Sequence, residues 1–210
     1  MSGTFPNPEL FKSMRITSNI NRLNSIDVSN KQYDKFISQR WQIEMQSIPL
    51  TRSQWNTIYS FILKQKGSIG TFNITPPLIS STRGTYPNDS NFKTYNGYLA
   101  GTSELQVDTT TVGDATFGIV GTLSVGDFIK FSNHDKVYQL TNNLTLQNFF
   151  GSPEQVPMRI FPALTTAVYN DTQIIFNSVP FKTRLIADNQ DFNANANNTY
   201  TYTLNVTEEY

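Results

Sequence analysis

His134 is the only histidine, and an imidazole can act as a general base or a metal ligand near neutral pH. Asp135 follows it directly, so the two could form a base oriented by a carboxylate. Both lie in the polar run Ser132–Asp135, which separates two apolar segments and has the composition of a hairpin turn. With no second histidine and no cysteine, a metal site would need carboxylates alone. We therefore interpret His134 as a solvated turn residue.

Paired carboxylates are the next chemical possibility, because glycoside hydrolysis requires two of them with one pKa raised. The candidates in the turn-rich part of the chain are Glu104, Asp108, Asp114 and Asp127. Aspartate in turns commonly accepts from its own backbone, and nothing distinguishes an acid from a base among the four. The pair Gly126-Asp127 interrupts two β-runs and predicts a structural turn, with glycine supplying a positive φ.

Other motifs with chemical meaning are weak or missing. A phosphate-binding loop needs several glycines leading into a helix, which neither Gly118 nor Gly121 does. No nucleophile elbow or kinase motif occurs. Tyrosines could stack on sugars, but strand aromatics usually fill cores and cross-strand pairs; the candidates are Tyr86, Tyr95, Tyr98, Tyr200, Tyr202 and Tyr210. The sequence predicts no catalytic, cofactor-binding or metal-binding residue, and hence no enzyme.

The composition narrows the functional classes. The 16 basic and 16 acidic residues balance, and no dense Lys/Arg cluster occurs, so direct nucleic-acid binding is not expected. Without cysteine, disulfides and thiolate chemistry are excluded. Neither a signal segment nor an 18-residue apolar window is found, which predicts a soluble protein without membrane insertion. Many aromatics on a weakly charged chain are typical of β-rich proteins that contact other proteins or sugars.

The segment Ser38–Leu78 carries the clearest structural signals. Polar and apolar residues alternate over Arg40–Met45, which predicts a strand with one buried face. Thr51-Arg-Ser-Gln54 has the pattern of a capping box, and Leu50 and Trp55 have the spacing of a hydrophobic staple. A helix is therefore expected to begin here.

The helix should bury Trp55, Ile58 and Ile62 and close at Gly67, a residue suited to left-handed backbone. Gly70–Ile74 resumes the two-residue alternation until Pro76-Pro77 stops it. The segment thus reads as a strand-helix-strand unit.

The remaining chain is predicted to be β-rich. Residues 1–35 read as an extended arm with short strands at Lys12–Ser18 and Leu23–Ser29, and Ser80–Thr94 has loop composition. Short strands separated by turns suggest a small barrel or sandwich, and further strands follow toward the C-terminus. These strand candidates are Glu104–Val107, Phe117–Val120, Phe128–Phe131, Lys136–Leu140, Met158–Pro162, Thr172–Phe176, Lys182–Ala187 and Thr199–Thr207.

The expected fold class is mostly β (α+β), with one long helix in the strand-helix-strand unit and a small β-barrel or β-sandwich region. Four segments follow from this interpretation. They are an arm over 1–35, the strand-helix-strand unit with its loop over 36–94, a barrel-like region over 95–165, and C-terminal strands over 166–210 that complete the first unit.

The order of several motifs resembles a family of tailed-bacteriophage distal tail proteins. The motifs are Phe5-Pro-Asn-Pro8, the Trp41 strand, the Leu50–Gln54 helix start with its end near Gly67, Gly70–Ile74 with Pro76-Pro77, Val125–Phe131 and Lys136–Leu140. The similarity covers about Phe5 to Leu185. Distal tail proteins are virion structural proteins of the baseplate or tail tip, without catalytic residues or cofactors.

The resemblance implies a ring of copies, expected to be hexameric, that connects the tail tube to hub, baseplate, fibre or receptor-binding components. Such a protein is made in the host bacterial cytoplasm and resides in the virion tail. We expect residues Met1–Lys35 and the loop Ser80–Asn96 to reach adjacent subunits, because ring formation uses strand edges and extended arms. A carbohydrate-binding module of the same particle remains the alternative, and a glycoside hydrolase is a third reading.

Overall fold

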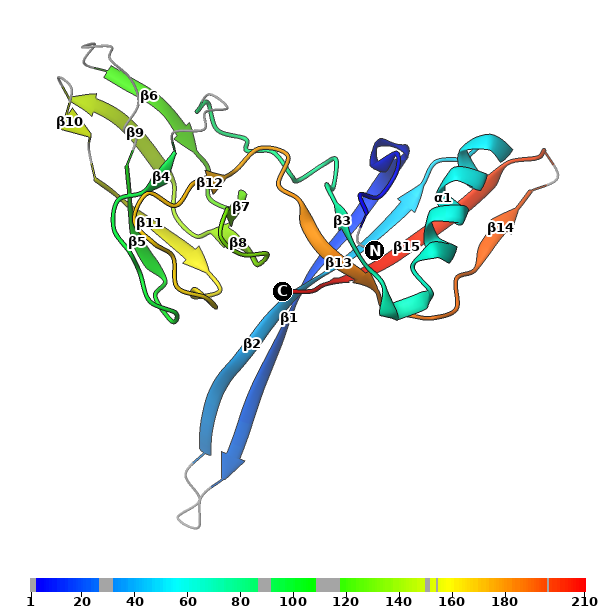
Figure 1. The fold of residues 1–210 in the computed structure, drawn as a ribbon, viewed down its shortest axis with the longest axis horizontal. Helices are drawn as coiled ribbons and strands as arrows, with labels where there is room; N and C mark the ends of the chain where they lie inside the picture. The colour runs from blue at the N-terminus through cyan, green and yellow to red at the C-terminus, as the bar shows by residue number, and fades with distance from the viewer. Residues whose placement is uncertain are drawn as a thin grey trace. The chain divides into compact units, whose positions relative to one another are not determined.

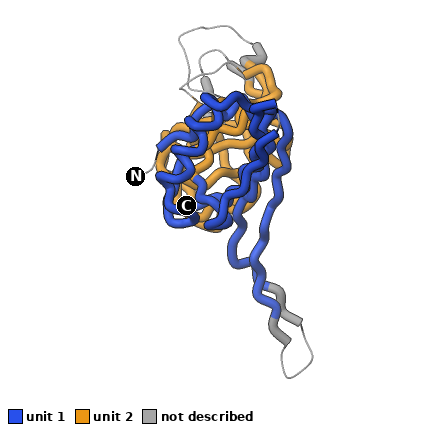
Figure 2. The backbone as a smooth tube through the Cα atoms, turned by 90° about the vertical axis from the view of Figure 1, so that its right-hand side faces the viewer, with its two compact units in different colours: residues 1–73, 183–209 blue, residues 74–182, 210 orange. Residues whose placement is uncertain are grey.

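The computed structural model describes residues 3–26, 32–86, 92–108, 118–149, 152–153, 155–195 and 197–210 (Figure 1). The chain divides into two compact units, distinguished by colour in Figure 2. Unit 1 comprises Met1–Asn73 and Thr183–Glu209, and unit 2 comprises Ile74–Lys182 with Tyr210. The fold is mostly β with one α-helix in the described ranges, which confirms the predicted fold class.

The unit boundaries differ from the four predicted segments. Residues 1–35 belong to unit 1 together with the strand-helix-strand segment, whereas 74–94 and 166–182 belong to unit 2. Hydrogen bonds between distant positions explain the assignment to unit 2, because Val179 N donates to Ser80 O at 2.8 Å and Ile174 N donates to Phe92 O at 2.9 Å. Local composition does not encode such pairings.

Unit 1 is built on an antiparallel sheet with one α-helix, α1 (Arg52–Lys64). The strand order is β1 (Phe11–Ile26), β2 (Gln32–Ser47), β15 (Tyr200–Glu208), β13 (Phe181–Leu185) and β3 (Thr71–Ile74), and β14 (Phe192–Ala194) also pairs with β15. Two short 3-10 turns, Pro8–Leu10 and Gly67–Ile69, flank this sheet. Figure 1 shows α1 lying alongside β15 and β14.

One face of this sheet is buried, as the alternation in β2 predicts. Trp41, Ile43 and Met45 are at most 3% exposed. Leu204 and Val206 of β15 pair with Met45 and Ile43, so they extend the same face into the next strand. Each fully buried side chain of this size contributes roughly 1.5–3 kcal/mol through removal from water.

Helix α1 covers part of this sheet through its predicted apolar residues, because Trp55, Ile58 and Ile62 are all buried. The Trp55 ring lies 5.4 Å from that of Tyr202, and the Phe61 ring lies 5.4 Å from that of Phe72. Two ring pairs thus connect the helix to β15 and β3.

The predicted capping box at the start of α1 is present. Thr51 Oγ1 accepts from Gln54 N at 3.4 Å, and Gln54 Oε1 accepts from Thr51 N at 3.0 Å. The helix ends earlier than expected, at Lys64, and Lys66 already has a left-handed φ of 55°. Gly67, at φ 69°, is the second of two such residues, and a Cβ atom there would lie 2.5 Å from Asp188 Oδ1. Glycine is therefore required by close packing as well as by backbone geometry.

The extended N-terminal arm was predicted to contain short strands, and that prediction is wrong about the length of the strands. Residues 11–26 form the single long strand β1, because β2 supplies a cross-strand partner along most of its length. Ahead of it, Phe5 is buried and its ring lies 5.7 Å from that of Phe61. Of the predicted strand Leu23–Ser29, residues 23–26 belong to β1 and the rest lies outside the described residues.

Unit 2 contains the predicted small barrel. Its six-stranded sheet has the order β12 (Ile174–Ile175), β7 (Phe128–Phe131), β8 (Val137–Leu140), β11 (Val156–Phe161), β5 (Glu104–Asp108) and β4 (Lys93–Thr94). A bridge between Lys93 and Gln173 joins β4 to the residue before β12, so the sheet is nearly closed. A second sheet has the order β10 (Ser152–Pro153), β9 (Leu144–Phe149) and β6 (Gly118–Leu123).

The barrel surrounds a continuous apolar core, including Phe131, Tyr138, Met158 and Leu105. All four side chains are fully buried. Near closure of the six-stranded sheet leaves its own end strands little free edge for pairing with another chain.

Candidate interaction surface

The strands β1 and β2 form a hairpin that extends beyond the rest of the unit 1 sheet (Figure 1). Its partner β15 pairs with β2 only from Gln42 to Gln46. We call Asn19–Ile26 with Gln32–Arg40 the distal hairpin, because there β1 and β2 form ladder pairs only with each other among the described residues. An isolated two-stranded hairpin is marginally stable in water. The distal hairpin is thus a candidate for stabilisation by another chain.

Large apolar side chains are exposed along the distal hairpin. Ile20, Leu23, Phe36 and Ile37 have exposed fractions of 47%, 55%, 48% and 58%. Burying the exposed portions of four such side chains would release roughly 3–6 kcal/mol before the costs of association. Exposed apolar clusters of this kind mark interaction surfaces more often than single exposed residues do.

Two of these residues, Ile20 and Phe36, continue a face that is buried nearer the sheet. Met14 pairs with Met45, Ile16 with Ile43 and Ile20 with Gln39, so Ile20 lies on the core-facing side of β1. A register shift between Asn21 and Arg22 then sets Arg22 opposite Phe36 and leaves Ile37 as the extra residue of the bulge. Phe36 therefore shares the face of Ile20. The apolar face runs past the point where unit 1 covers it.

The hairpin also presents an unpaired strand edge. β1 is the first strand in the sheet order, and its outer side pairs with no strand in the described part of the chain. It is 16 residues long and contains no proline. β1 carries Arg15 and Arg22, and a register shift interrupts its pairing with β2, but its outer edge is long enough to accept a strand of another chain. The distal hairpin thus offers both backbone and apolar contacts.

The loop Ser80–Asn96 was also expected to reach adjacent subunits, but its described residues pack within unit 2. Tyr86 and Phe92 are buried, and their rings lie 5.4 Å apart. Thr82 Oγ1 donates to Asp127 Oδ2. Residues 87–91 of the loop lie outside the described residues. The described part of Ser80–Asn96 therefore packs within its own unit, and the case for contact with neighbours is carried by the arm alone.

His134 lies in the predicted turn between β7 and β8, but it is only partly solvated. Its ring stacks on Phe131 at 5.6 Å. Its Nε2 is 2.8 Å from Tyr138 Oη, and its Nδ1 is 2.8 Å from Asn133 Oδ1. The carbonyl oxygen of Asn133 can only accept, so Nδ1 carries the proton and Nε2 accepts from the tyrosine hydroxyl.

This environment disfavours a charged imidazole. Burial, and then the positive charge of Lys130, lower the pKa of His134 from 6.5 to about 4, although Asp135 opposes the shift. A neutral ring whose Nε2 lone pair already accepts from Tyr138 has no free nitrogen to serve as a base or metal ligand. The arrangement instead ties the turn to the barrel core.

Asp135 forms an ion-pair cluster and does not assist His134. Its two carboxylate oxygens accept from Lys130 Nζ and Lys182 Nζ, each at 2.9 Å. Partial burial acts to raise the pKa of Asp135, but the hydrogen bonds from Lys182 and Lys130 prevail and hold it below its usual value. The group therefore remains a carboxylate near neutral pH and stabilises the two lysines.

The carboxylates considered as catalytic candidates have separate structural roles where they are described. Asp127 is 3% exposed, and it accepts from Ser124 N at 2.9 Å and from Arg83 N at 3.2 Å. Gly126 has a φ of 91°, which confirms the predicted turn. Glu104 is exposed and pairs with Arg159 Nε at 3.0 Å. Asp108 ends β5, and Asp114 lies outside the described residues.

The glycine and tyrosine candidates also have structural roles. Gly118 and Gly121 lie in β6, and Gly121 adjoins the backbone of Tyr86. Tyr86 and Tyr202 are buried, and Tyr98 Oη accepts from Gln106 N at 2.7 Å. Tyr200 stacks near Trp55, Tyr210 lies against Lys136, and Tyr95 is 36% exposed. Together they form no exposed row on which a sugar chain could stack.

The described residues offer neither a metal-binding cluster nor a helix able to cross a membrane. They contain no group of three or more His, Cys, Asp or Glu side chains placed to hold a metal ion. Over the same residues, no helix has the length and apolar character to cross a membrane.

The sequence interpretation did not identify the distal hairpin. Its apolar residues follow no sustained period, because one strand contains a bulge and because Leu23 lies on the opposite face from Ile20. One signal could have identified it. Two segments of similar length, 11–26 and 32–47, follow each other closely, and each is polar with a few large apolar residues. Comparison with known proteins adds no assignment, because no protein-family model and no curated protein matches the chain.

Proposed function

We propose that this protein is a structural component of a bacteriophage tail, located at the distal tail or baseplate. Copies assemble as a ring, expected to be hexameric, that connects the tail tube to hub or receptor-binding components. The motif order from Phe5 to Leu185 supports the family, and the distal hairpin is the observation that carries the assembly. The protein is made in the host cytoplasm and is incorporated into the virion.

The hairpin fits a contact between successive copies. It carries four half-exposed apolar side chains and a free strand edge on one projecting element. If each copy lays its hairpin on a different surface of the next, the contact is heterologous, and such contacts form a ring when the rotation closes. The near-neutral charge of the chain makes the contact depend little on salt.

A direct test is the oligomeric state of the purified chain, measured by light scattering and electron microscopy over a range of concentrations. The double variant Ile20→Asp/Phe36→Asp places two charges in the proposed contact and should reduce assembly at least tenfold. Ile69→Asp is the matched control, because Ile69 is 82% exposed in unit 1 and lies outside the hairpin. Rings formed equally well by the double variant, or a wild type that stays monomeric at all concentrations, would refute the proposal.

A carbohydrate-binding module of the same particle is the alternative from another class. Tyr86 and Tyr202 are buried and the other candidate tyrosines are scattered, so they give it no shared stacking surface. Glycan-array binding that disappears on Tyr95→Ala or Tyr200→Ala would favour this alternative over a purely structural role.

A glycoside hydrolase, the third reading, requires a carboxylic acid with a raised pKa. Hydrogen bonds lower the pKa values of Asp135 and Asp188, which is the wrong direction for that role. Turnover of a polysaccharide, abolished by one Asp or Glu substitution, would establish this reading in its place.

A further inference from the structure

The polar segment after β13 leaves the sheet of unit 1 and returns to it at β14. Leu185 pairs with Val206 and Phe192 pairs with Tyr202. Between these two pairs, the segment 186–191 is longer than the part of β15 that it faces, residues 203–205. The longer segment must therefore bend away from β15.

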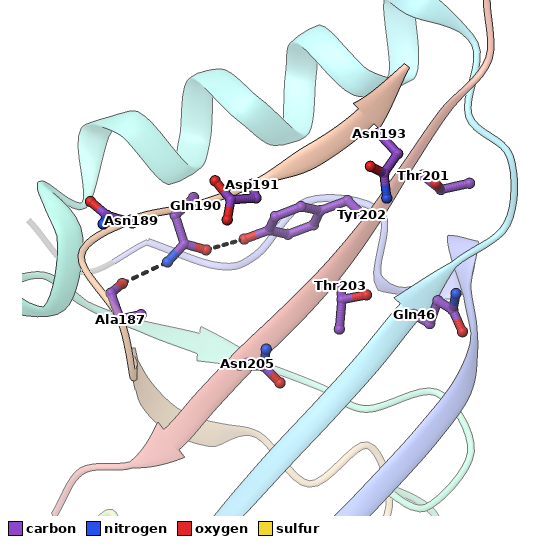
Figure 3. A pocket seen from close by; sticks show the side chains of 10 residues that line it. All are labelled: Gln46, Ala187, Asn189, Gln190, Asp191, Asn193, Thr201, Tyr202, Thr203 and Asn205. Atoms are coloured by element: carbon purple, nitrogen blue, oxygen red, sulfur yellow. Dashed lines mark hydrogen bonds between the residues drawn. The ribbon is translucent and has the colours of Figure 1, made fainter. Parts of the chain in front are cut away.

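A pocket of about 290 Å³ lies beside this bend, within unit 1 (Figure 3). Its lining is composed mainly of amide and hydroxyl side chains: Gln46, Ala187, Asn189, Gln190, Asp191, Asn193, Thr201, Tyr202, Thr203 and Asn205. The pocket has the size of the smallest ligand sites, which hold one small molecule.

The bend also exposes part of the β15 edge to the pocket. Asn205 O accepts from Ile186 N at 3.1 Å, so the main chain of Asn205 faces this edge. Backbone groups two residues apart on a strand point the same way, so Thr203 faces the edge as well. The β13 ladder begins at Val206 and the β14 ladder ends at Tyr202, so Thr203 lies in the gap between them. A backbone donor and acceptor therefore border the pocket.

The pocket wall is held in place by hydrogen bonds that do not occupy the pocket itself. Asp188 Oδ1 accepts from Ser68 N at 2.8 Å, beside the close approach of Gly67. Gln190 Nε2 donates to Ala187 O at 2.6 Å, and Tyr202 Oη donates to Gln190 Oε1 (Figure 3). Burial raises the pKa of Tyr202, so its hydroxyl keeps the proton that it donates. A wall fixed in this way costs little to order when a ligand binds.

The lining chemistry defines the class of ligand. It contains no Lys, Arg or His and a single carboxylate, Asp191, so a phosphate, sulfate or acidic sugar would find no cation. Its one aromatic ring, Tyr202, is 2% exposed, so an apolar ligand would find little surface. Paired amide donors and acceptors match vicinal hydroxyl groups, each of which can donate and accept.

We propose that this pocket binds one neutral sugar residue, held by the side chains of Gln46, Asn193 and Asn205 and by the free edge at Thr203. This binding does not depend on ring assembly. Because hydrogen bonds exchanged with water contribute little net free energy, we expect affinities of about 1 mM.

The test is NMR titration of the isotope-labelled full chain with glucose, galactose, N-acetylglucosamine and glucuronate, each to about 50 mM, well above a millimolar dissociation constant. At least one neutral sugar should shift the Thr203 backbone amide and the Asn205 side-chain amide. Glucuronate should bind at least fivefold more weakly, because Asp191 repels it. Asn205→Ala should weaken neutral-sugar binding at least fivefold, and the exposed helix residue change Asn56→Ala should leave it unchanged.

Shifts at other surfaces, equal binding of glucuronate, or no shift with any sugar would overturn the proposal. A second variant, Thr203→Pro, removes the edge donor and should also abolish binding; its folded state is checked by the retained dispersion of the unit 1 resonances, including that of the buried Trp55 side chain. Oligomeric state measured on the same samples separates this result from the proposed ring. A monomer that binds sugar at this site refutes the ring alone, and a ring that binds none refutes the sugar site alone.

Discussion

The barrel of unit 2 and the distal hairpin of unit 1 differ in how far their strand edges are paired and their apolar side chains are buried. In the barrel, the bridge from Lys93 to Gln173 joins the first and last strands, and core residues such as Phe131 are fully buried. In the distal hairpin, Phe36 and Ile37 are about half exposed and the outer edge of β1 has no partner strand in the described chain. The comparison teaches that the six-stranded barrel sheet nearly closes on itself, whereas the distal hairpin keeps a strand edge and apolar side chains exposed, as the proposed contact requires.

The largest expected effect is in the barrel core. Phe131→Ala removes a ring that is fully buried and lies 5.5 Å from the Tyr138 ring. The cavity should cost about 3–5 kcal/mol of the free energy of unfolding, measured by urea denaturation. A loss below about 1 kcal/mol would show that the barrel is loosely packed and would break the comparison.

The next largest effect concerns the loop that the barrel holds. Asp127→Ala deprives the Thr82 hydroxyl and the amides of Ser124 and Arg83 of a buried acceptor. The free energy of unfolding should fall by about 2–3 kcal/mol, because each donor left without an acceptor remains removed from water and makes no hydrogen bond. Asp127→Asn, which retains one acceptor oxygen, should lose less. Equal losses in both variants would contradict this account.

An effect of pH on stability is also expected in the barrel. Because the His134 pKa falls to about 4 in the folded protein, the unfolded chain binds more protons below pH 6.5. Stability is then complete above pH 6.5 and decreases as the pH falls toward 4. The ring is partly exposed, so we expect a loss of about 1–2 kcal/mol over this interval. Denaturation of His134→Gln at several pH values should show a smaller slope between pH 6.5 and 4.

The smallest effect on stability should be at the distal hairpin. Phe36→Ser removes a side chain that is 48% exposed, so the monomer should lose no more than about 0.5 kcal/mol by urea denaturation. Assembly, measured on the same variant by light scattering, should nevertheless weaken. A large loss of monomer stability would mean that Phe36 packs within its own chain, which would remove the contrast with the barrel.

Local signals predicted much of unit 1. The capping box at Thr51 and the alternation through Trp41 and Ile43 act over a few residues, and the helix and strand appear where these signals stand. Short strands such as β4 and β14 were not predicted, because two or three residues carry no readable period. Barrel closure joins residues far apart along the chain, which no local pattern specifies.

Side-chain environments were harder to predict than strands. His134 was placed correctly in a turn, yet its ring is enclosed because Phe131 and Tyr138 come from the two strands that flank the turn. The pocket beside Thr203 arises from unequal chain lengths opposite β15, a property of register. The polar sequence Asp188–Asn198 gave no motif from which to infer it.

Gly67 has a consequence for the mutational tolerance of unit 1. Any side chain at this position would meet Asp188, the residue that fastens the pocket wall to Ser68. A saturation scan should therefore accept almost nothing but glycine at position 67, whereas Ile69, two residues away and 82% exposed, should accept nearly every substitution. Two positions in one short 3-10 turn would then differ sharply in the number of substitutions that they tolerate.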